Sequence, residues 1–340
     1  MKILGIETSC DETAAAVVED GAKILSNVVV SQIDIFAEYG GVIPEVAARS
    51  HLEAMMPVVN KALSDAGCTW EDIDAIAVTH APGLLGSLLI GTLTARTLAI
   101  LHDKPLYAVH HLKSHVYANW LSGEKPAFPL LALVVSGGHT QILYMPAHNQ
   151  FEIIGTTRDD AVGECFDKVA KILGLPYPGG PSIAKTALEG DAEKYKLPHP
   201  KIEGLDFSFS GLKTAVLRTV QKELGLPISH PSHDLKNHLS KKQAADFAAS
   251  FQKTAVEILC EKLALALEQH PDAQSVVIAG GVSANKALRE ALPEAYFPTP
   301  SLSGDNGAMV AAAAYYEIIS GVEPTDPYSL NIYPRISIEK

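Results

Sequence analysis

Two histidines and one aspartate have the types and spacing that metal chemistry requires. His111 and His115 are four residues apart. On a helix both imidazoles would leave the same face, with Cβ atoms about 6 Å apart, which is close enough to share one divalent metal. Asp305, which precedes Asn306 and Gly307 at an expected helix start, is the best third ligand. Two imidazoles and a carboxylate with open positions would suit iron or zinc acting as a Lewis acid.

The same three residues also have plain structural interpretations. The chain contains 13 histidines, so a pair spaced by four can arise without any function. Asp is also a favoured N-cap, and Asp305 could accept backbone N–H bonds there. A carboxylate has two oxygens, so capping and metal ligation are compatible.

Three glycine pairs suggest a nucleotide site in the second half of the chain: Gly137-Gly138, Gly179-Gly180 and Gly280-Gly281. Two of them directly follow expected strands, and bare backbone N–H groups in such turns can hold a phosphate. They match neither G-x-G-x-x-G nor G-x-x-x-x-G-K-[ST], which excludes the Rossmann and P-loop patterns. The arrangement favours the nucleotide site of the actin, Hsp70 and sugar-kinase architecture.

The elements that must position these residues alternate between strand and helix. A three-strand meander is expected over residues 2–31, a helix over 46–66, a strand over 73–79 and a further helix to about 102. The second half again opens with a strand, a polar turn and a return strand, over residues 130–145. This predicts an α/β fold with two lobes, built from duplicated ribonuclease-H-like domains, with a ligand cleft between them.

The predicted domain boundaries follow from a Pro- and Gly-containing segment. Residues 122–129 contain two prolines and a glycine between a helix and a new apolar strand, which is typical of a linker. We therefore expect an N-terminal lobe over 1–121, with the histidines at its end, and a C-terminal nucleotide-binding lobe over 130–340. A helical insertion is expected over about 196–240, and the last helix is expected to pack back on the first lobe.

Composition limits the possible partners and compartments. A formal net charge of -12 argues against broad nonspecific binding to nucleic acid, so any RNA contact must be local or shared with a partner. The four cysteines form no C-x-x-C pair, which suits a reducing cytosol. No apolar run approaches the roughly 20 residues of a membrane helix. The acid at Glu7 is unlike a secretory signal, so a cytoplasmic location is expected.

Eight ordered motifs across nearly the whole chain resemble one family. They are GIETSCDET (5–13), GVIPE (41–45), PGLLGSL (82–88), HHLKSH (110–115), VSGGHT (135–140), YPGGP (177–181), AGGVSAN (279–285) and DNGAM (305–309). Together they resemble the bacterial tRNA N6-adenosine threonylcarbamoyltransferase family, formerly described as an O-sialoglycoprotein endopeptidase. The resemblance implies transfer of a threonylcarbamoyl group from threonylcarbamoyl-AMP to the N6 amine of the adenosine 3′ of the anticodon, in tRNAs that read codons beginning with A.

The resemblance also implies which residues form the site. The metal ligands match His111, His115 and Asp305, with one divalent metal per subunit, iron first and zinc or magnesium as alternatives. The positions that bind threonylcarbamoyl-AMP, ATP or ADP match Val135, Ser136, Gly137, Gly138, His139, Asp167, Gly180 and Asn285. Many relatives have an aspartate where this chain has Ala184, so a ribose contact from that position is not carried over.

A proton must leave the attacking amine, and the first hairpin turn supplies Asp11 and Glu12 as candidate bases. We assign the role to Asp11 as a hypothesis. The alternative role of both acids is to cap the turn.

Two other functions fit these residues less well. A metal-dependent peptidase would need the glutamate of H-E-x-x-H, whereas Leu112 follows His111. A noncatalytic ATP-binding scaffold would have little need for three metal ligands.

The resemblance further implies four partners: tRNA, a paralogous subunit of the same fold (TsaB-like) that pairs through the first lobe, a P-loop ATPase (TsaE-like), and threonylcarbamoyl-AMP synthase as the supplier.

Overall fold

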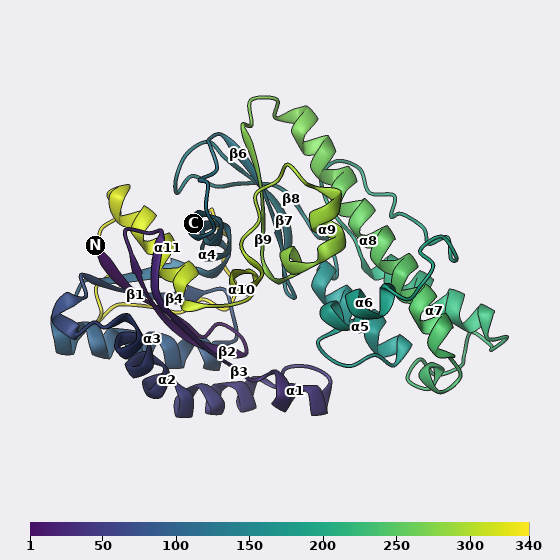
Figure 1. The fold of residues 1–340 in the computed structure, drawn as a ribbon, viewed down its shortest axis with the longest axis horizontal. Helices are drawn as coiled ribbons and strands as arrows, with labels where there is room; N and C mark the ends of the chain where they lie inside the picture. Colours follow the sequence, from purple (N-terminus) through teal and green to yellow (C-terminus); the bar gives the residue numbers. More distant parts are fainter. Residues whose placement is uncertain (340) are drawn as a thin grey trace. The chain divides into compact units, whose positions relative to one another are not determined.

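The computed structural model describes residues 1–339, and the chain divides into two compact units. Unit 1 comprises Met1–Leu130, Met145–Glu152 and the described part of Tyr296–Lys340. Unit 2 comprises Leu131–Tyr144 and Ile153–Ala295. Each unit contains one sheet with helices packed on it (Figure 1).

The sheet of unit 1 has the strand order β3-β2-β1-β4-β5. Its strands are β1 (Lys2–Glu7), β2 (Glu12–Glu19), β3 (Lys23–Ser31), β4 (Ala75–Ala81) and β5 (Leu106–His110). The first three are antiparallel neighbours, which confirms the predicted meander, and β4 and β5 continue the sheet in parallel. Parallel pairing needs crossover connections, and the helices after β3 and β4 supply them.

The alternation of side chains along β1 explains how helices cover both faces of this sheet. Leu4 and Ile6 belong to an apolar cluster with α2 (Pro44–Ala66) and α3 (Leu85–His102). Gly5 faces the other way, and a Cβ there would lie 2.2 Å from the carbonyl oxygen of Gly307, at the start of α11 (Gly307–Ile319). Only a glycine allows this close approach, which brings the start of α11 onto β1.

Three short helices complete unit 1: α1 (Ile33–Tyr39), α4 (His111–Tyr117) and α10 (Pro300–Ser303). Helix α3 is long and apolar enough to span a membrane by length and composition, although the sequence had suggested no such segment. Core helices of soluble proteins pass the same test. Helix α3 packs on α2 and β4.

The sheet of unit 2 has the order β8-β7-β6-β9, which repeats the order of the first four strands of unit 1. Its strands are β6 (Leu130–Val135), β7 (Thr140–Met145), β8 (Glu152–Thr156) and β9 (Ser275–Ala279). Its helices are α5 (Val162–Leu173), α6 (Gly179–Ala187), α7 (Ser210–Glu223), α8 (Lys241–Gln269) and α9 (Lys286–Ala291). The repeated order confirms the predicted α/β fold with duplicated sheets.

The C-terminal segment departs from the predicted boundary. The sequence assigned residues 130–340 to the second lobe, with only the last helix packing back on the first, whereas the structure groups Met145–Glu152 and the whole described part of Tyr296–Lys340 with unit 1. The physical reason is the nearly continuous burial of α11, whose alanines and Val310 pack on β1, β2 and β4. In the expected insertion over 196–240, the structure contains α7 and a 3-10 turn, Leu235–Asn237.

Candidate functional site

The helix predicted for the two histidines is present and begins where β5 ends. His110, the N-cap of α4, accepts a hydrogen bond from the backbone N–H of Leu112 through its Nδ1. Burial lowers the pKa of His110 to about 3, so this ring is neutral and able to accept. One helical turn then aligns His111 and His115, whose ring centroids are 4.5 Å apart.

Asp305 joins these histidines from the loop between α10 and α11. Its Oδ1 lies 3.1 Å from Nε2 of His115 and 3.6 Å from Nε2 of His111. The N-cap of α11 is Asn306, whose Oδ1 accepts from the backbone N–H of Met309 at 3.0 Å. The capping interpretation of Asp305 was therefore wrong, and Asp305 faces the imidazoles.

The donor set fits a divalent metal. Ligand atoms of the three side chains lie within 4.8 Å of one another. Ligands about 2.0–2.2 Å from a tetrahedral metal lie roughly 3.3 Å apart, close to the two spacings observed here. Both ring nitrogens of His115 are buried; Nδ1 forms no hydrogen bond with any described residue, and Nε2 has the Asp305 carboxylate at 3.1 Å but not in hydrogen-bond geometry. A buried imidazole without such a bond is costly unless another ligand satisfies it, and a metal would do so.

A carboxylate that the sequence analysis did not single out positions His111. Glu7, at the end of β1, is fully buried, and its Oε2 lies 3.0 Å from Nδ1 of His111. The same oxygen accepts from the hydroxyl of Thr79 at 2.6 Å. A metal-ligating histidine usually donates its second N–H to such a group, which aims the other nitrogen at the metal. The signal in the sequence was an acid ending an otherwise apolar strand.

The protonation of His111 depends on these acids. Burial lowers the pKa of His111, but the negative charges of Asp305 and Glu7 raise it by a larger amount. The net result is a pKa raised to about 9. Without a metal the ring therefore carries a proton on each nitrogen at neutral pH. Binding of a cation at Nε2 would replace one of these protons.

Asp11 lies in unit 1 on the turn between β1 and β2, and Glu12 is the first residue of β2. Asp11 is 9% exposed, and its backbone carbonyl accepts from the N–H of Gln32 at 3.1 Å. Burial, reinforced by the negative charges of Asp305 and Asp11, raises the pKa of Glu12. Glu12 thus favours its protonated form, whereas a general base must be ionised.

Another histidine missed by the sequence analysis holds this turn. His51 of α2 is fully buried, and its Nε2 donates to the carbonyl of Cys10 at 2.9 Å. Its Nδ1 then accepts from the hydroxyl of Thr13 at 2.8 Å. Burial lowers the pKa of His51 and keeps the ring neutral, as these two bonds require. His51 therefore fixes both sides of Asp11.

The first predicted nucleotide turn connects β6 to β7 in unit 2. The backbone N–H of Ser136 donates to the carbonyl of His139 at 2.8 Å, and the Ser136 hydroxyl accepts from the N–H of His139 at 3.1 Å. A Cβ on Gly137 or Gly138 would meet no described atom within 4 Å. Packing within the described chain therefore does not require these glycines, which is consistent with space kept for a ligand.

The remaining predicted nucleotide residues have structural partners. Asp167 of α5 accepts from the N–H of Gly179 at 2.7 Å, which fixes the start of α6 beside Gly180. Asn285 caps α9 by accepting from the N–H of Ala287, and its amide donates to Oε1 of Gln252 at 2.9 Å. Val135 lies against Gly280, where a Cβ would be 2.5 Å from the Val135 carbonyl oxygen. These contacts connect the turns to α5, α8 and β6.

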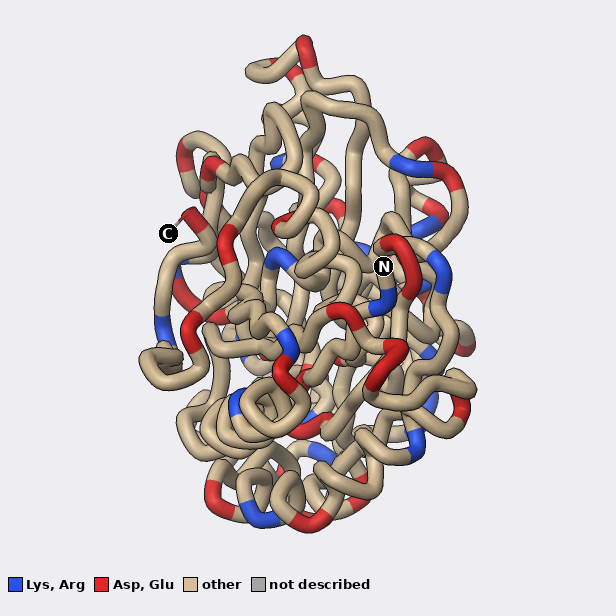
Figure 2. Tube along the Cα trace, turned by 90° about the vertical axis from the view of Figure 1, so that its left-hand side faces the viewer, with Lys and Arg blue, Asp and Glu red and all other residues tan. Residues whose placement is uncertain are grey.

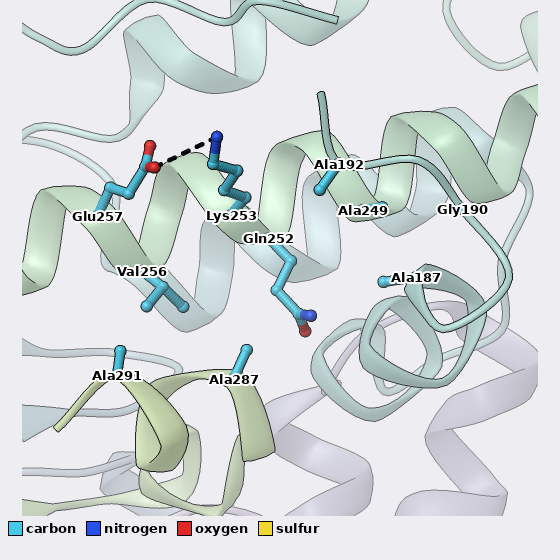
Figure 3. A pocket seen from close by; sticks show the side chains of 10 residues that line it. All are labelled: Ala187, Gly190, Ala192, Ala249, Gln252, Lys253, Val256, Glu257, Ala287 and Ala291. Atoms are coloured by element: carbon cyan, nitrogen blue, oxygen red, sulfur yellow. Dashed lines mark ion pairs between the residues drawn. The ribbon is translucent and has the colours of Figure 1, made fainter. Parts of the chain in front are cut away.

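Unit 2 also has a cavity of about 360 Å³ between α6, α8 and α9 (Figure 3). It is lined by Ala187, Gly190, Ala192, Ala249, Gln252, Lys253, Val256, Glu257, Ala287 and Ala291. None of these belongs to the predicted nucleotide set. The cavity and the predicted nucleotide set are linked by the hydrogen bond between Gln252, which lines the cavity, and Asn285. The cavity is therefore next to the predicted site but is not the predicted site itself.

Acidic and basic residues are interspersed along the chain, and the acids outnumber the bases (Figure 2). Lys168 forms ion pairs with Asp160 at 2.7 Å and with Glu164 at 3.0 Å. Lys242 pairs with Asp246 at 2.7 Å. These two lysines are thus engaged with acids of this chain, which leaves less positive charge for phosphates.

Comparisons with known proteins identify the family of this chain. The family model described as TsaD, tRNA N6-adenosine threonylcarbamoyltransferase, matches residues 23–312. A protein of that name from Symbiobacterium thermophilum is 50% identical, covering 99% of this chain and 96% of the relative. One from Caldicellulosiruptor saccharolyticus is 46% identical, covering 99% and 98%.

The fold is also found in a solved structure of low sequence similarity. The activator of 2-hydroxyisocaproyl-CoA dehydratase from Clostridium difficile, with bound ADPNP, aligns with a TM-score of 0.51 at 14% identity, covering 94% of this chain and 96% of the activator. That likeness supports the two-lobed actin, Hsp70 and sugar-kinase fold. From the family model and its whole-length relatives, the chain belongs to the tRNA N6-adenosine threonylcarbamoyltransferase family.

Proposed function

We propose that this chain transfers the threonylcarbamoyl group of threonylcarbamoyl-AMP to the N6 amine of the adenosine 3′ of the anticodon, in tRNAs that read codons beginning with A. Membership of the family over nearly the whole chain is the observation that carries the proposal. The cluster of His111, His115 and Asp305 adds a chemical reason, because it fits a Lewis-acid metal. We place the reaction in the cytoplasm.

His111, His115 and Asp305 would hold one divalent metal, with iron preferred to zinc or magnesium. When bound, the metal supplies positive charge that neutralises phosphate and polarises a carbonyl oxygen. Glu7 orients His111, and the buried ring of His115 limits access of water to its side of the site. The substrate is an activated anhydride, so orientation and charge neutralisation are the main demands on the protein.

Asp11 is proposed to take the proton from the attacking amine. Glu12 is less suited to this role, since its raised pKa favours the neutral acid. The hydrogen bonds of His51 hold the turn on both sides of Asp11. Asp11→Asn should therefore abolish transfer while metal binding persists, and near-normal turnover by this variant would rule the assignment out.

Residues of unit 2 are proposed to hold the adenylate. Gly137 and Gly138 have open space where a side chain would lie, and Gly180 does too. Backbone N–H groups at the start of α6 favour a negative charge. Val135, Ser136, His139, Asp167 and Asn285 form the walls and supports of these turns.

A paralogous subunit is proposed to cover the exposed apolar face of α2 and α3. Leu52 and Leu85 are 67% and 60% exposed, and Met56 and Leu93 line a groove of about 250 Å³ there. Leu52→Asp should abolish a complex with the TsaB-like subunit in size-exclusion chromatography. Leu188→Asp is a matched control, because Leu188 is 79% exposed in unit 2. Unchanged assembly of Leu52→Asp would contradict this interface.

The function is tested by incubating metal-defined protein with threonylcarbamoyl-AMP, unmodified tRNA, the TsaB-like subunit and the TsaE-like ATPase. Nucleoside analysis should then show threonylcarbamoyladenosine, and His115→Ala should not form it. The synthase that supplies threonylcarbamoyl-AMP can replace the added adenylate. Release of peptide fragments from a glycoprotein, without nucleoside modification, would instead support the peptidase; α4 has no acid beside His111 to activate water for that reaction.

A further inference from the structure

A second group of metal-ligating side chains lies in the segment between α7 and α8 of unit 2. His230, Asp234 and His238 follow one another at intervals of four residues. One ligand atom from each lies within 4.8 Å of the others. The family chemistry described above uses none of these residues.

The backbone explains why the three side chains converge. Successive hydrogen bonds between residues three apart wind the chain from Pro231 to His238, including Asp234 N–H to Pro231 and His238 N–H to Leu235. These successive turns bring both ends of the segment close to Asp234, so that His230 and His238 reach its carboxylate from either side. Leu235, at the centre of the turn, is fully buried and anchors it.

The three side chains are already oriented towards a common point. Oδ2 of Asp234 lies 2.9 Å from Nε2 of His230 and 3.1 Å from Nε2 of His238. Its other oxygen accepts from the amide of Asn237 at 2.8 Å, which fixes the carboxylate plane.

Both separations are slightly shorter than the roughly 3.3 Å expected between ligands of a tetrahedral zinc ion. A small outward rotation of the rings would therefore admit the ion. His230 and Asp234 are partly buried and His238 is exposed, so a fourth position is open to water. Two imidazoles, one carboxylate and water form a common zinc ligand set.

We propose that His230, Asp234 and His238 form a second divalent-metal site, which binds Zn²⁺ and clamps the segment between α7 and α8. The start of this segment is also held by α7, because Gln221 donates to the carbonyls of Ile228 and His230. Arg218 donates to the Ile228 carbonyl as well. A metal would add a cross-link from His230 to His238, in a segment whose first residues are already held by α7.

Metal stoichiometry of the full chain tests this site. Protein stripped with a chelator is dialysed against Zn²⁺, and the bound metal is measured per chain. The wild type is expected to bind two ions, while the double variant His230→Asn/His238→Asn binds one. His111→Asn/His115→Asn should also bind one ion. A variant that combines all four substitutions should bind no ion. His233→Asn is the matched control, since His233 is an exposed histidine of the same segment outside the cluster.

A second readout is independent of the first metal site. Lys236 is an exposed trypsin target inside the turn. A ligand that binds only the closed segment suppresses opening by a factor of 1 + [L]/Kd, so Zn²⁺ at ten times Kd should slow cleavage after Lys236 about tenfold. Co²⁺ in the His111→Asn/His115→Asn background should give the visible absorption bands of a tetrahedral site.

The outcomes are distinct. Equal stoichiometry in wild type and His230→Asn/His238→Asn would overturn the proposal, as would Zn²⁺ binding weaker than about 1 mM. Cleavage after Lys236 that does not respond to Zn²⁺ would overturn the clamp. Circular dichroism of each variant verifies that it is folded.

Discussion

The contact between Glu7 and His111 gives the sharpest prediction, Glu7→Gln. The change keeps the size of a fully buried side chain but removes its negative charge. Both carboxylate oxygens accept hydrogen bonds, one from Ser9 N–H and the other from Thr79 and His111. The amide must place an N–H group against one of these donors, so at least one bond is lost.

The size of the effect follows from those bonds. A hydrogen bond to a charged group contributes about 1.5–3 kcal/mol, and loss of an outer-shell partner typically lowers metal affinity about 10–100-fold. We expect Glu7→Gln to weaken metal binding in that range, because Nδ1 of His111 loses the group that aims Nε2. Folding should also be destabilised, by about 1–3 kcal/mol, because a buried donor is left without an acceptor.

Metal affinity is measured by competition with a chromophoric chelator, at a temperature where circular dichroism shows the variant to be folded. Glu19→Gln is the control, because Glu19 is an acid on the neighbouring strand whose partner is the surface residue Lys23. The reasoning is refuted if Glu7→Gln binds metal as tightly as the wild type. It is also refuted if Glu19→Gln weakens binding equally.

Three further predictions concern two glycines and a buried acid. Gly138→Ala should leave the free energy of unfolding within about 0.5 kcal/mol, since a Cβ meets open space, yet weaken adenylate binding in calorimetry. Gly280→Ala should instead lower the melting temperature, because its Cβ would meet Val135 and its φ is +88°. Unchanged adenylate affinity of Gly138→Ala would remove that turn from the site. Burial raises the pKa of Glu317 to about 7, despite Lys113 nearby, so its neutral form is favoured in the folded chain. The stability that this form contributes is present below pH 4.5 and is lost as pH rises through 7, so Glu317→Gln should gain about 1–3 kcal/mol over wild type at pH 8 and nothing at pH 4.5. Equal gains at both pH values would show that ionisation of Glu317 is not the cause.

Local patterns in the sequence predicted several of the helices, strands and turns. The spacing of His111 and His115 predicted a helix with both rings on one side, and α4 confirms it, since that relation depends only on helical geometry. Apolar runs separated by short polar turns predicted the meander of β1, β2 and β3, because strands joined by short turns pair with their sequence neighbours. The glycine pairs marked the turns after β6 and β9.

Tertiary structure decided which distant groups meet. Asp305 could have been an N-cap, and only the folded chain shows Asn306 in that role and Asp305 beside the imidazoles. Glu7 lies 104 residues from His111 in the sequence, and their contact arises because β1 and β5 flank β4 in one sheet. The sequence led us to expect that the last helix packs back on the first lobe, but only the folded chain shows that it does so through close packing of Gly5 and Gly307. Periodicity reports the local backbone, whereas these contacts depend on how separate elements pack.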